Sequence, residues 1–205
     1  MMGDMTDADR PPVRAGRPRR SSAEVLADAA AELFLEQGYA GTTVDDVARR
    51  AGVSRGTFFN YFASKADTFW VEADRTLALL PDALRASGPE GDPVRGAAAA
   101  LVGLARAHGA DGVPWALTQA EAMRLGDDVV TSAAPRLVVA AGAVAGHLGS
   151  RGWDGDGAGG RVAAAGLVTA AAAAFVEWAR RGVARPALEE LVAPAVAAVV
   201  RAHAH

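Results

Sequence analysis

Residues 42–65 read TTVDDVARRAGVSRGTFFNYFASK and predict two short helices joined by a tight turn. Apolar residues recur at the i, i+3, i+4 spacing of one buried helix face, namely Val44, Val47 and Ala48. Thr43 is a candidate N-cap for this first helix. Gly52 can adopt the left-handed conformation that ends it, and Ser54 can cap the next helix. The stretch therefore predicts a helix-turn-helix unit.

The second helix of this unit carries the polar residues suited to DNA. Arginine can donate to O6 and N7 of guanine together, and asparagine can pair with adenine in the same way. A glycine near the start of the helix lets its backbone approach DNA closely. The candidate contacts are Ser54, Arg55, Gly56, Thr57 and Asn60. The spacing alone also fits an ordinary helical hairpin with a solvated polar face.

Residues 22–70 resemble the DNA-binding domain of the tetracycline-repressor (TetR) family of transcriptional regulators. The matching segments are AAAELF at 29–34, GY at 38–39, TTVDDVA at 42–48, AGVSRGTF at 51–58, YF at 61–62 and SK at 64–65. So many matches at fixed spacing favour a DNA-binding module over an ordinary hairpin. The resemblance covers about a quarter of the chain, and the rest agrees with the family only in length and helical character.

The resemblance also implies roles for single residues. It implies phosphate contacts for Thr43, Tyr61 and Lys65, and contacts to bases or backbone for Ser54, Arg55 and Thr57. Phe59 stands where the family most often has tyrosine, and it can pack against sugar but cannot donate to phosphate. The predicted DNA-binding set is Arg17, Arg19, Thr43, Ser54, Arg55, Gly56, Thr57, Phe59, Asn60, Tyr61 and Lys65.

Charge divides the chain into a basic and an acidic part. Residues 10–65 carry nine basic and six acidic side chains, whereas residues 66–205 carry twelve basic and fifteen acidic ones. This asymmetry fits a basic DNA-binding face on an acidic body. The chain has no cysteine, which excludes disulfides. We find no signal-peptide core and no apolar run of about 18 residues, and therefore expect a cytoplasmic protein without a membrane span.

Three regions are expected along the chain. Residues 1–20 predict a disordered basic arm, residues 21–66 the helix-turn-helix domain, and residues 67–205 a ligand-binding and dimerisation domain. Gly16-Arg17-Pro18 resembles the core of the AT-hook, so Arg17 and Arg19 are candidates for a narrow minor groove. A solvated tail that adds nonspecific attraction explains the arm equally well.

The whole chain predicts an all-α fold of about nine helices, because no segment alternates with the period of a strand. The expected helices outside the helix-turn-helix unit are 22–37, 65–80 ending before Pro81, 93–109, 114–125, 127–149, 158–181 and 186–203. Pro135 is a candidate break in the fifth of these, and Pro194 should kink the last or leave it locally irregular.

Two residue sets in the body are candidates for binding. Large side chains among many alanines favour an apolar effector pocket, lined by Trp115, Gln119, Met123, Phe175 and Trp178. A helical apolar face near the C-terminus favours a homodimer interface, formed by Phe175, Leu188, Leu191, Val192, Val196 and Val199. The alternative for the first set is ordinary core packing. The alternative for the second set is packing within one chain.

Together these features predict a ligand-responsive DNA-binding regulator, a repressor. It should bind a palindromic operator as a homodimer and be released by a small, mostly apolar effector. We expect no catalytic residues, no cofactor and no metal: the histidines are isolated, and the G-x-G-x-x-G at 155–160 follows no predicted strand. The alternatives are a helical carrier or enzyme that kept the module, and an architectural protein without an effector.

Overall fold

The computed structural model describes residues 22–88, 91–109, 112–123, 125, 128–153, 158–182 and 185–203. Within these ranges the side chains of residues 115, 116, 120, 121 and 130 are not described. Every regular element in the described part is helical, so the all-α expectation is confirmed. The arm at 1–20, with Arg17 and Arg19, and residues 155–157 of the G-x-G-x-x-G segment lie outside the described residues.

The helix-turn-helix unit forms as its local signals predict. It consists of α1 (Ser22–Gln37), α2 (Val44–Arg50) and α3 (Arg55–Phe59). The Thr43 hydroxyl accepts from the Asp46 amide at 3.1 Å, and the Asp46 carboxylate accepts from the Thr43 amide at 3.0 Å. This reciprocal pair is a capping box. Gly52 has φ +72°, so the left-handed residue falls where the turn between α2 and α3 needs it.

The head, residues 22–65, is held together by side chains that are completely buried. These are Leu26, Ala30, Phe34, Val47 and Phe58. Burial of each large side chain stabilises the head by about 2 kcal/mol. Phe34 meets Phe69 edge to face with ring centroids 5.4 Å apart. Because α1 contributes most of this cluster, it fixes the angle at which α3 is presented.

The segment after the head is not one helix ending before Pro81, so that prediction is wrong. It is divided into the 3-10 helix η1 (Lys65–Trp70), α4 (Val71–Ala78) and α5 (Leu80–Ala86). Pro81 lies in the first turn of α5, where a missing amide hydrogen removes no helical hydrogen bond. The proline therefore begins a helix instead of ending one.

The body contains α6 (Pro93–Ala107), α7 (Trp115–Thr118), α8 (Ala120–Met123), α9 (Asp128–Ser150), α10 (Ala158–Arg180) and α11 (Leu188–Ala202). The helix expected at 114–125 is broken at Gln119. Neither Pro135 nor Pro194 interrupts its helix, so the break considered at Pro135 does not occur, and the kink expected at Pro194 stays a prediction. Both prolines are exposed, so water can reach the carbonyl that each leaves without a helical donor.

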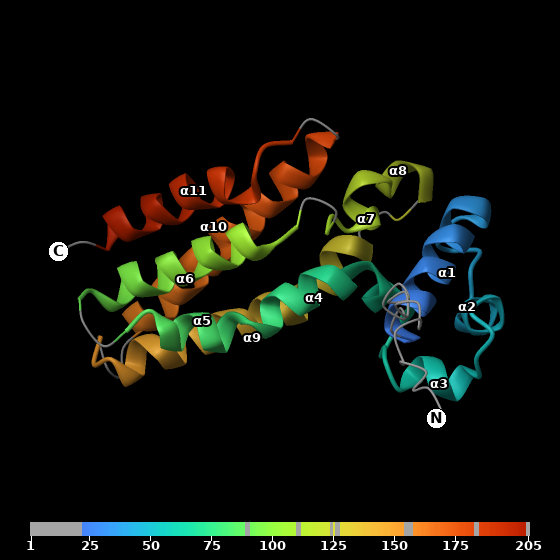
Figure 1. Ribbon diagram of the computed structural model, residues 1–205, viewed down its shortest axis with the longest axis horizontal. Coiled ribbons are helices and arrows are strands. Elements are labelled where there is room, and N and C mark those ends of the chain that lie inside the picture. Colours follow the sequence, from blue (N-terminus) through green and yellow to red (C-terminus); the bar gives the residue numbers. More distant parts are fainter. Residues whose placement is uncertain are drawn as a thin grey trace, which may run out of the picture.

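The molecule is elongated, with the head at one end and the C-terminus at the other (Figure 1). Helices α6, α9, α10 and α11 form a bundle, and α4 and α5 lie along it. Helix α10 packs against α6, α9 and α11, and its buried residues are mostly small, such as Ala163 and Ala164. Small residues allow the helix axes to approach closely.

By length and composition alone, α10 is apolar enough to cross a membrane. The sequence-based expectation that the chain has no such segment is corrected to this extent. A helix at the centre of a bundle has the same composition, and Ala163, Ala164 and Leu167 of α10 are completely buried. Its packing against three other helices accounts for its apolar character.

Head and body share part of one core. Met123, Leu125 and Val129, which follow or begin body helices, are buried in the same cluster as α1 and α2. The Tyr39 amide also donates to the Met123 carbonyl at 2.9 Å. A displacement of the segment around Met123 therefore reaches the turn between α1 and α2 directly.

Candidate nucleic-acid interface and junction cavity

Arg55, the first residue of α3, is held by two neighbours on the exposed side of the head. Its Nη1 donates to both carboxylate oxygens of Asp45 on α2, each at 2.9 Å. Its guanidinium lies 5.2 Å from the ring centroid of Phe59, which is 45% exposed. The predicted DNA-reading arginine is thus oriented by a residue that sequence reasoning did not select, Asp45.

The small hydroxyl residues of the predicted set cap the two helices. The Ser54 side chain accepts from the Thr57 amide at 3.0 Å, and the two hydroxyls lie 2.9 Å apart. The Thr43 hydroxyl donates to Asp46 at 2.6 Å. Hydrogen bonds from Thr43 lower the pKa of Asp46. These caps hold polar groups at the starts of α2 and α3, and their predicted contacts with DNA stay predictions.

The fold does not require a glycine at position 56. A Cβ built on it would lie 3.6 Å from the Ser54 hydroxyl, an ordinary contact distance. Its φ is not in the left-handed region. The prediction that Gly56 serves close approach to DNA is therefore compatible with the structure. Asn60 and Tyr61, which follow on the same side of the unit, are exposed.

Lys65 has a structural task that its sequence position did not reveal. Its Nζ donates to the carbonyl oxygens of Tyr39 at 2.6 Å and Thr42 at 2.8 Å. It also lies 4.0 Å from the Tyr39 ring centroid. Desolvation lowers the pKa of Lys65 and raises the pKa of Tyr39 to about 12. A third hydrogen on Nζ can still reach phosphate, and that role stays a prediction.

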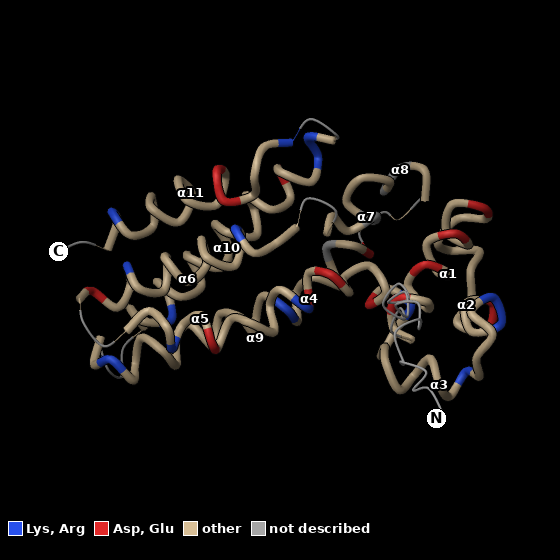
Figure 2. Tube along the Cα trace, in the orientation of Figure 1, with Lys and Arg blue, Asp and Glu red and all other residues tan. Residues whose placement is uncertain are grey.

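The described head is less basic than the sequence division suggested. Residues 22–65 carry four basic and six acidic side chains. Arg50 is further neutralised by Glu32 and Glu36, at 3.1 and 2.6 Å. Basic residues stand at the end of α2 and the start of α3 in Figure 2. The positive balance of residues 10–65 thus comes from the five arginines that precede Ser22, at 10, 14, 17, 19 and 20.

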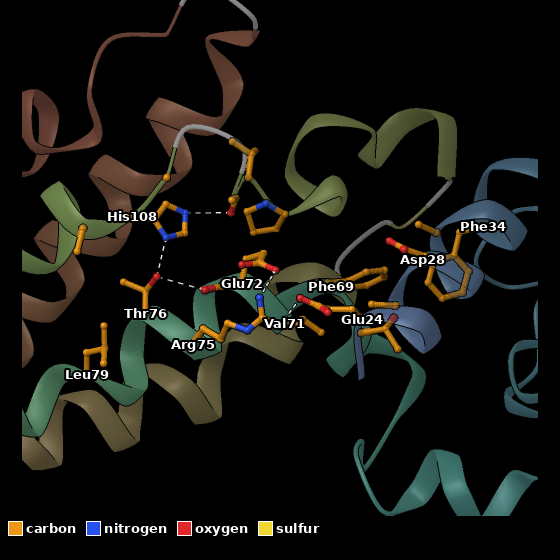
Figure 3. Close-up of a pocket in the computed structure, with 18 of the residues that line it drawn as sticks. Glu24, Asp28, Phe34, Phe69, Val71, Glu72, Arg75, Thr76, Leu79 and His108 are labelled. Atoms are coloured by element: carbon orange, nitrogen blue, oxygen red, sulfur yellow. Dashed lines mark hydrogen bonds and ion pairs between the residues drawn. The ribbon is translucent and has the colours of Figure 1, made fainter. Parts of the chain in front are cut away.

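A cavity of about 580 Å³ lies where head and body meet. We call it the junction cavity. It is lined by residues of α1, η1 and α4, and by Leu79, residues 107–109, residues 112–114 and Met123. Figure 3 shows charged side chains of α1 and α4 pointing toward one another across it. Arg75 pairs with Glu24 of α1 and with Glu72 at 2.9 Å. Sequence reasoning selected none of these three residues, although Glu24 and Asp28 share one side of α1.

His108 closes the junction cavity on the body side. Its Nδ1 lies 2.7 Å from the Thr76 hydroxyl of α4, and its Nε2 lies 2.9 Å from the Gly112 carbonyl oxygen. Its ring meets those of Phe175 and Trp178 edge to face. Burial lowers the pKa of His108, which favours the neutral ring. The histidine therefore joins α4, the end of α6 and α10.

Sequence comparison with known proteins matches the head, and structural comparison matches the whole fold. The sequence profile of the bacterial regulatory proteins of the tetR family matches residues 26–69. The putative mycofactocin biosynthesis transcriptional regulator MftR of Mycobacterium tuberculosis is 42% identical over 67 residues, 33% of this chain and 34% of that protein. The chain therefore matches only about a third of this curated relative.

The structural likeness extends over nearly all of the chain. The TetR-family transcriptional repressor FadR of Thermus thermophilus, solved in complex with lauroyl-CoA, is 26% identical and superposes with a TM-score of 0.55. The match covers 87% of this chain and 93% of that one. Residues 26–69 form a tetR-family helix-turn-helix domain. The fatty acid degradation regulator FadR of Bacillus halodurans, at 16% identity and a TM-score of 0.50, shares the fold over 86% of this chain.

The tetR-family match at residues 26–69 confirms the resemblance. The predicted effector residues, in contrast, are scattered. Met123 lines the junction cavity, whereas Gln119 is exposed elsewhere. Trp178 is buried and its Nε1 donates to the Pro186 carbonyl oxygen at 2.8 Å. Phe175 stacks on Trp178 with ring centroids 5.8 Å apart. The side chain of Trp115 lies outside the described residues, and the effector role of the set stays a prediction.

Three residues of the predicted dimer set are buried within the chain itself, and the dimer role of the set stays a prediction. Leu188, Val192 and Val196 are 6%, 3% and 2% exposed because α11 packs against α6 and α10 of the same chain. They have almost no surface left for a second copy. Val199 also packs within the chain, close to Gly166 of α10. Leu191 lines a groove between α10 and α11 and remains a candidate.

Proposed function

We propose that this tetR-family protein is a DNA-binding transcriptional regulator that inserts α3 into the major groove. The observation that carries the proposal is the placement of Arg55 at the exposed start of α3, oriented by Asp45 and Phe59. A guanidinium in this position can donate to O6 and N7 of guanine. Capping by Ser54 keeps the start of the helix well defined.

The regulator acts as a homodimer on a palindromic operator. A face of α10 supports this, because Arg161, Ala165, Thr169, Ala173 and Glu177 are all exposed at every fourth position. When the helix crosses its copy antiparallel at Thr169, Arg161 faces the copy's Glu177 and Ala165 faces Ala173. Small residues in the middle allow close contact, and opposite charges meet at the ends. The two heads of such a dimer read half-sites about 34 Å apart.

The dimer responds to a small, mostly apolar effector and acts as a cytoplasmic repressor. The junction cavity supports an effector because it lies between the head and the body. Thermus thermophilus FadR, described as a repressor and solved with lauroyl-CoA, supports both the sign of regulation and the use of a small molecule. The effector weakens DNA binding only if it binds the non-binding geometry more tightly.

Footprinting on the DNA that flanks the protein's own gene tests this function. At about 0.15 M salt with competitor DNA, we expect a protected palindrome. Arg55→Ala should lose this protection while circular dichroism and dimerisation stay unchanged. Arg85→Ala is the matched control, because Arg85 is an exposed, ion-paired arginine on α5, outside the head. Unchanged protection by Arg55→Ala would contradict the assignment of α3.

A further inference from the structure

The walls of the junction cavity are largely apolar. Phe34, Phe69, Val71, Leu79 and Met123 all line it. Phe69 belongs to the core cluster that it shares with the head, so a molecule in the cavity would lie against the edge of that core. A volume of about 580 Å³ is of the size that holds a drug-sized molecule.

Acidic side chains outnumber basic ones among the described residues that line the junction cavity. Three carboxylates line it, those of Glu24, Asp28 and Glu72, whereas Arg75 is the basic side chain among the described lining residues. Arg75 already interacts with two of the carboxylates, Glu24 and Glu72. His108, at the opposite wall, is kept neutral by burial, which lowers its pKa. The described lining therefore has a net charge of −2.

The Arg75 contacts also tie the head to the rest of the protein. Glu24 is on α1 of the head, and Arg75 is on α4, which leads into the body (Figure 3). A positively charged group entering the cavity would compete with Arg75 for the carboxylates. Such competition would loosen the link between α1 and α4, the movement that a change in head orientation requires.

We propose that the effector of the junction cavity is a hydrophobic cation, an ammonium or similar group carried on an apolar, preferably aromatic body. The carboxylates of Glu24, Asp28 and Glu72 attract the charge. The apolar wall formed by Phe69, Val71 and Leu79 accepts the apolar body. Its regulatory consequence rests on the DNA-binding function proposed above. Binding of the cation itself does not.

The same lining disfavours anionic effectors. An acyl-CoA, the ligand class in Thermus thermophilus FadR, brings several phosphate charges. In the junction cavity these charges would meet three carboxylates and one arginine that is already paired. Like charges at short range in a partly desolvated site repel strongly. This chain is thus expected to differ in effector class from that relative.

Two ions of the same shape and opposite charge make the first test. Tetraphenylphosphonium and tetraphenylborate are titrated into the full-length protein, with binding measured by calorimetry. We expect the phosphonium to bind at least about tenfold more tightly than the borate. Lauroyl-CoA should not compete with it. Equal or tighter binding of the borate, or displacement of the phosphonium by lauroyl-CoA, would overturn the proposal.

Charge-neutralising variants locate the site. Glu24→Gln and Glu72→Gln keep the side-chain shape and should each weaken phosphonium binding about tenfold. Glu36→Gln is the matched control, because Glu36 is an exposed glutamate on α1 that pairs with Arg50 outside the cavity. Full affinity in both cavity variants would refute the assignment, provided their thermal unfolding matches that of the unmodified chain. If either variant unfolds early, the comparison of the two ions on the unmodified chain decides.

Measurements of DNA binding distinguish failure of this proposal from failure of the proposed function. Phosphonium should release the protein from its footprinted palindrome, and borate should not. If no DNA is protected but the phosphonium binds with the charge preference described, the regulator function fails and the cation site stands. If the palindrome is protected but the phosphonium neither binds nor releases it, the cation site fails and the regulator function stands.

Discussion

At the scale of the residue, Arg55, which we propose reads DNA, is already restrained by two neighbours in the protein alone. Asp45 accepts both hydrogen bonds from Nη1 of Arg55, and Phe59 lies against its guanidinium. Restraint lowers the conformational entropy lost on binding. It also brings a carboxylate toward the phosphates, which repels them. We therefore expect Asp45 to increase selectivity for the operator and to decrease general affinity for DNA.

Replacing this carboxylate should separate the two effects. In Asp45→Asn we expect nonspecific DNA binding to rise slightly, because a negative charge is removed. The ratio of operator to random-duplex affinity should fall about tenfold, since Arg55 loses its charge-assisted partner. Competition binding with both duplexes at one salt concentration measures this ratio. Asp82→Asn, which removes another exposed aspartate paired with an arginine, should leave it unchanged. A constant ratio in Asp45→Asn would show that the pair does not orient Arg55.

Gly56 offers a second test on the same face. Gly56→Ala meets no clash and should stabilise α3 by about 0.5–1 kcal/mol, because alanine loses less backbone entropy. Operator affinity should nevertheless fall, because the new methyl group faces DNA. Thermal unfolding and operator titration measure the two effects. Gly103→Ala, also in an unobstructed helical position, should gain stability without losing affinity. Unchanged operator affinity in Gly56→Ala would remove the close-approach explanation.

At the scale of the element, His108 connects three helices at the body side of the junction cavity. Its ring bonds with Thr76 of α4, sits at the end of α6, and packs against Phe175 and Trp178 of α10. Desolvation lowers its pKa below the ordinary value of 6.5. The unfolded chain therefore binds a proton at a higher pH than the folded one.

This difference makes stability depend on pH with a definite sign. As pH falls through 6.5 toward the lowered folded pKa, the unfolded state takes up the proton first and the free energy of unfolding decreases. His108→Gln should remove this part of the decrease, measured by urea unfolding at pH 7.5 and 5.5. His147, whose pKa burial also lowers, contributes separately, so His147→Gln should keep the His108 part. An unchanged pH dependence in His108→Gln would show that the ring is not desolvated as described.

Short-range sequence patterns predicted most of the helices, but not which other helices pack against them. The caps at Thr43 and Ser54, and the buried Phe58, follow from spacing over four residues. The contact between Glu24 and Arg75 joins residues 51 positions apart, and no local pattern specifies it. The apolar face of α11 was correctly located. Periodicity shows that a face is apolar without showing whether α6 and α10 or a second chain covers it.

At the scale of the whole molecule, the positive balance of residues 10–65 comes from arginines that precede Ser22 in the sequence. The five arginines before Ser22 exceed the four basic residues of the described head. Neutralising phosphates releases counterions, which makes affinity fall steeply with salt. The arm should therefore set most of the salt dependence of DNA binding, whether or not it enters the minor groove.

Deleting residues 1–20 tests the arm. We expect operator affinity to fall severalfold and the slope of log affinity against log salt to become shallower, by up to about four for five arginines. Unchanged affinity and slope would exclude a role for the arm in binding. Replacing Arg17 and Arg19 by lysine keeps the charge and serves as the matched variant. A loss with lysine favours insertion into a narrow minor groove, whereas full retention favours nonspecific attraction.

The two-fold symmetry of the proposed dimer gives the last prediction. Arg161 and Glu177 lie eight residues before and after Thr169, so each faces the other's copy when α10 crosses itself at that threonine. Arg161→Glu places two glutamates together at each end, and Glu177→Arg places two arginines there. Each should weaken dimerisation about tenfold, while the double swap restores opposite charges and most of the affinity. Sedimentation equilibrium measures the three dissociation constants. Full dimerisation in both single variants, or a double variant as weak as either, would place the symmetry axis elsewhere, and the half-site spacing would then have to be derived from another face.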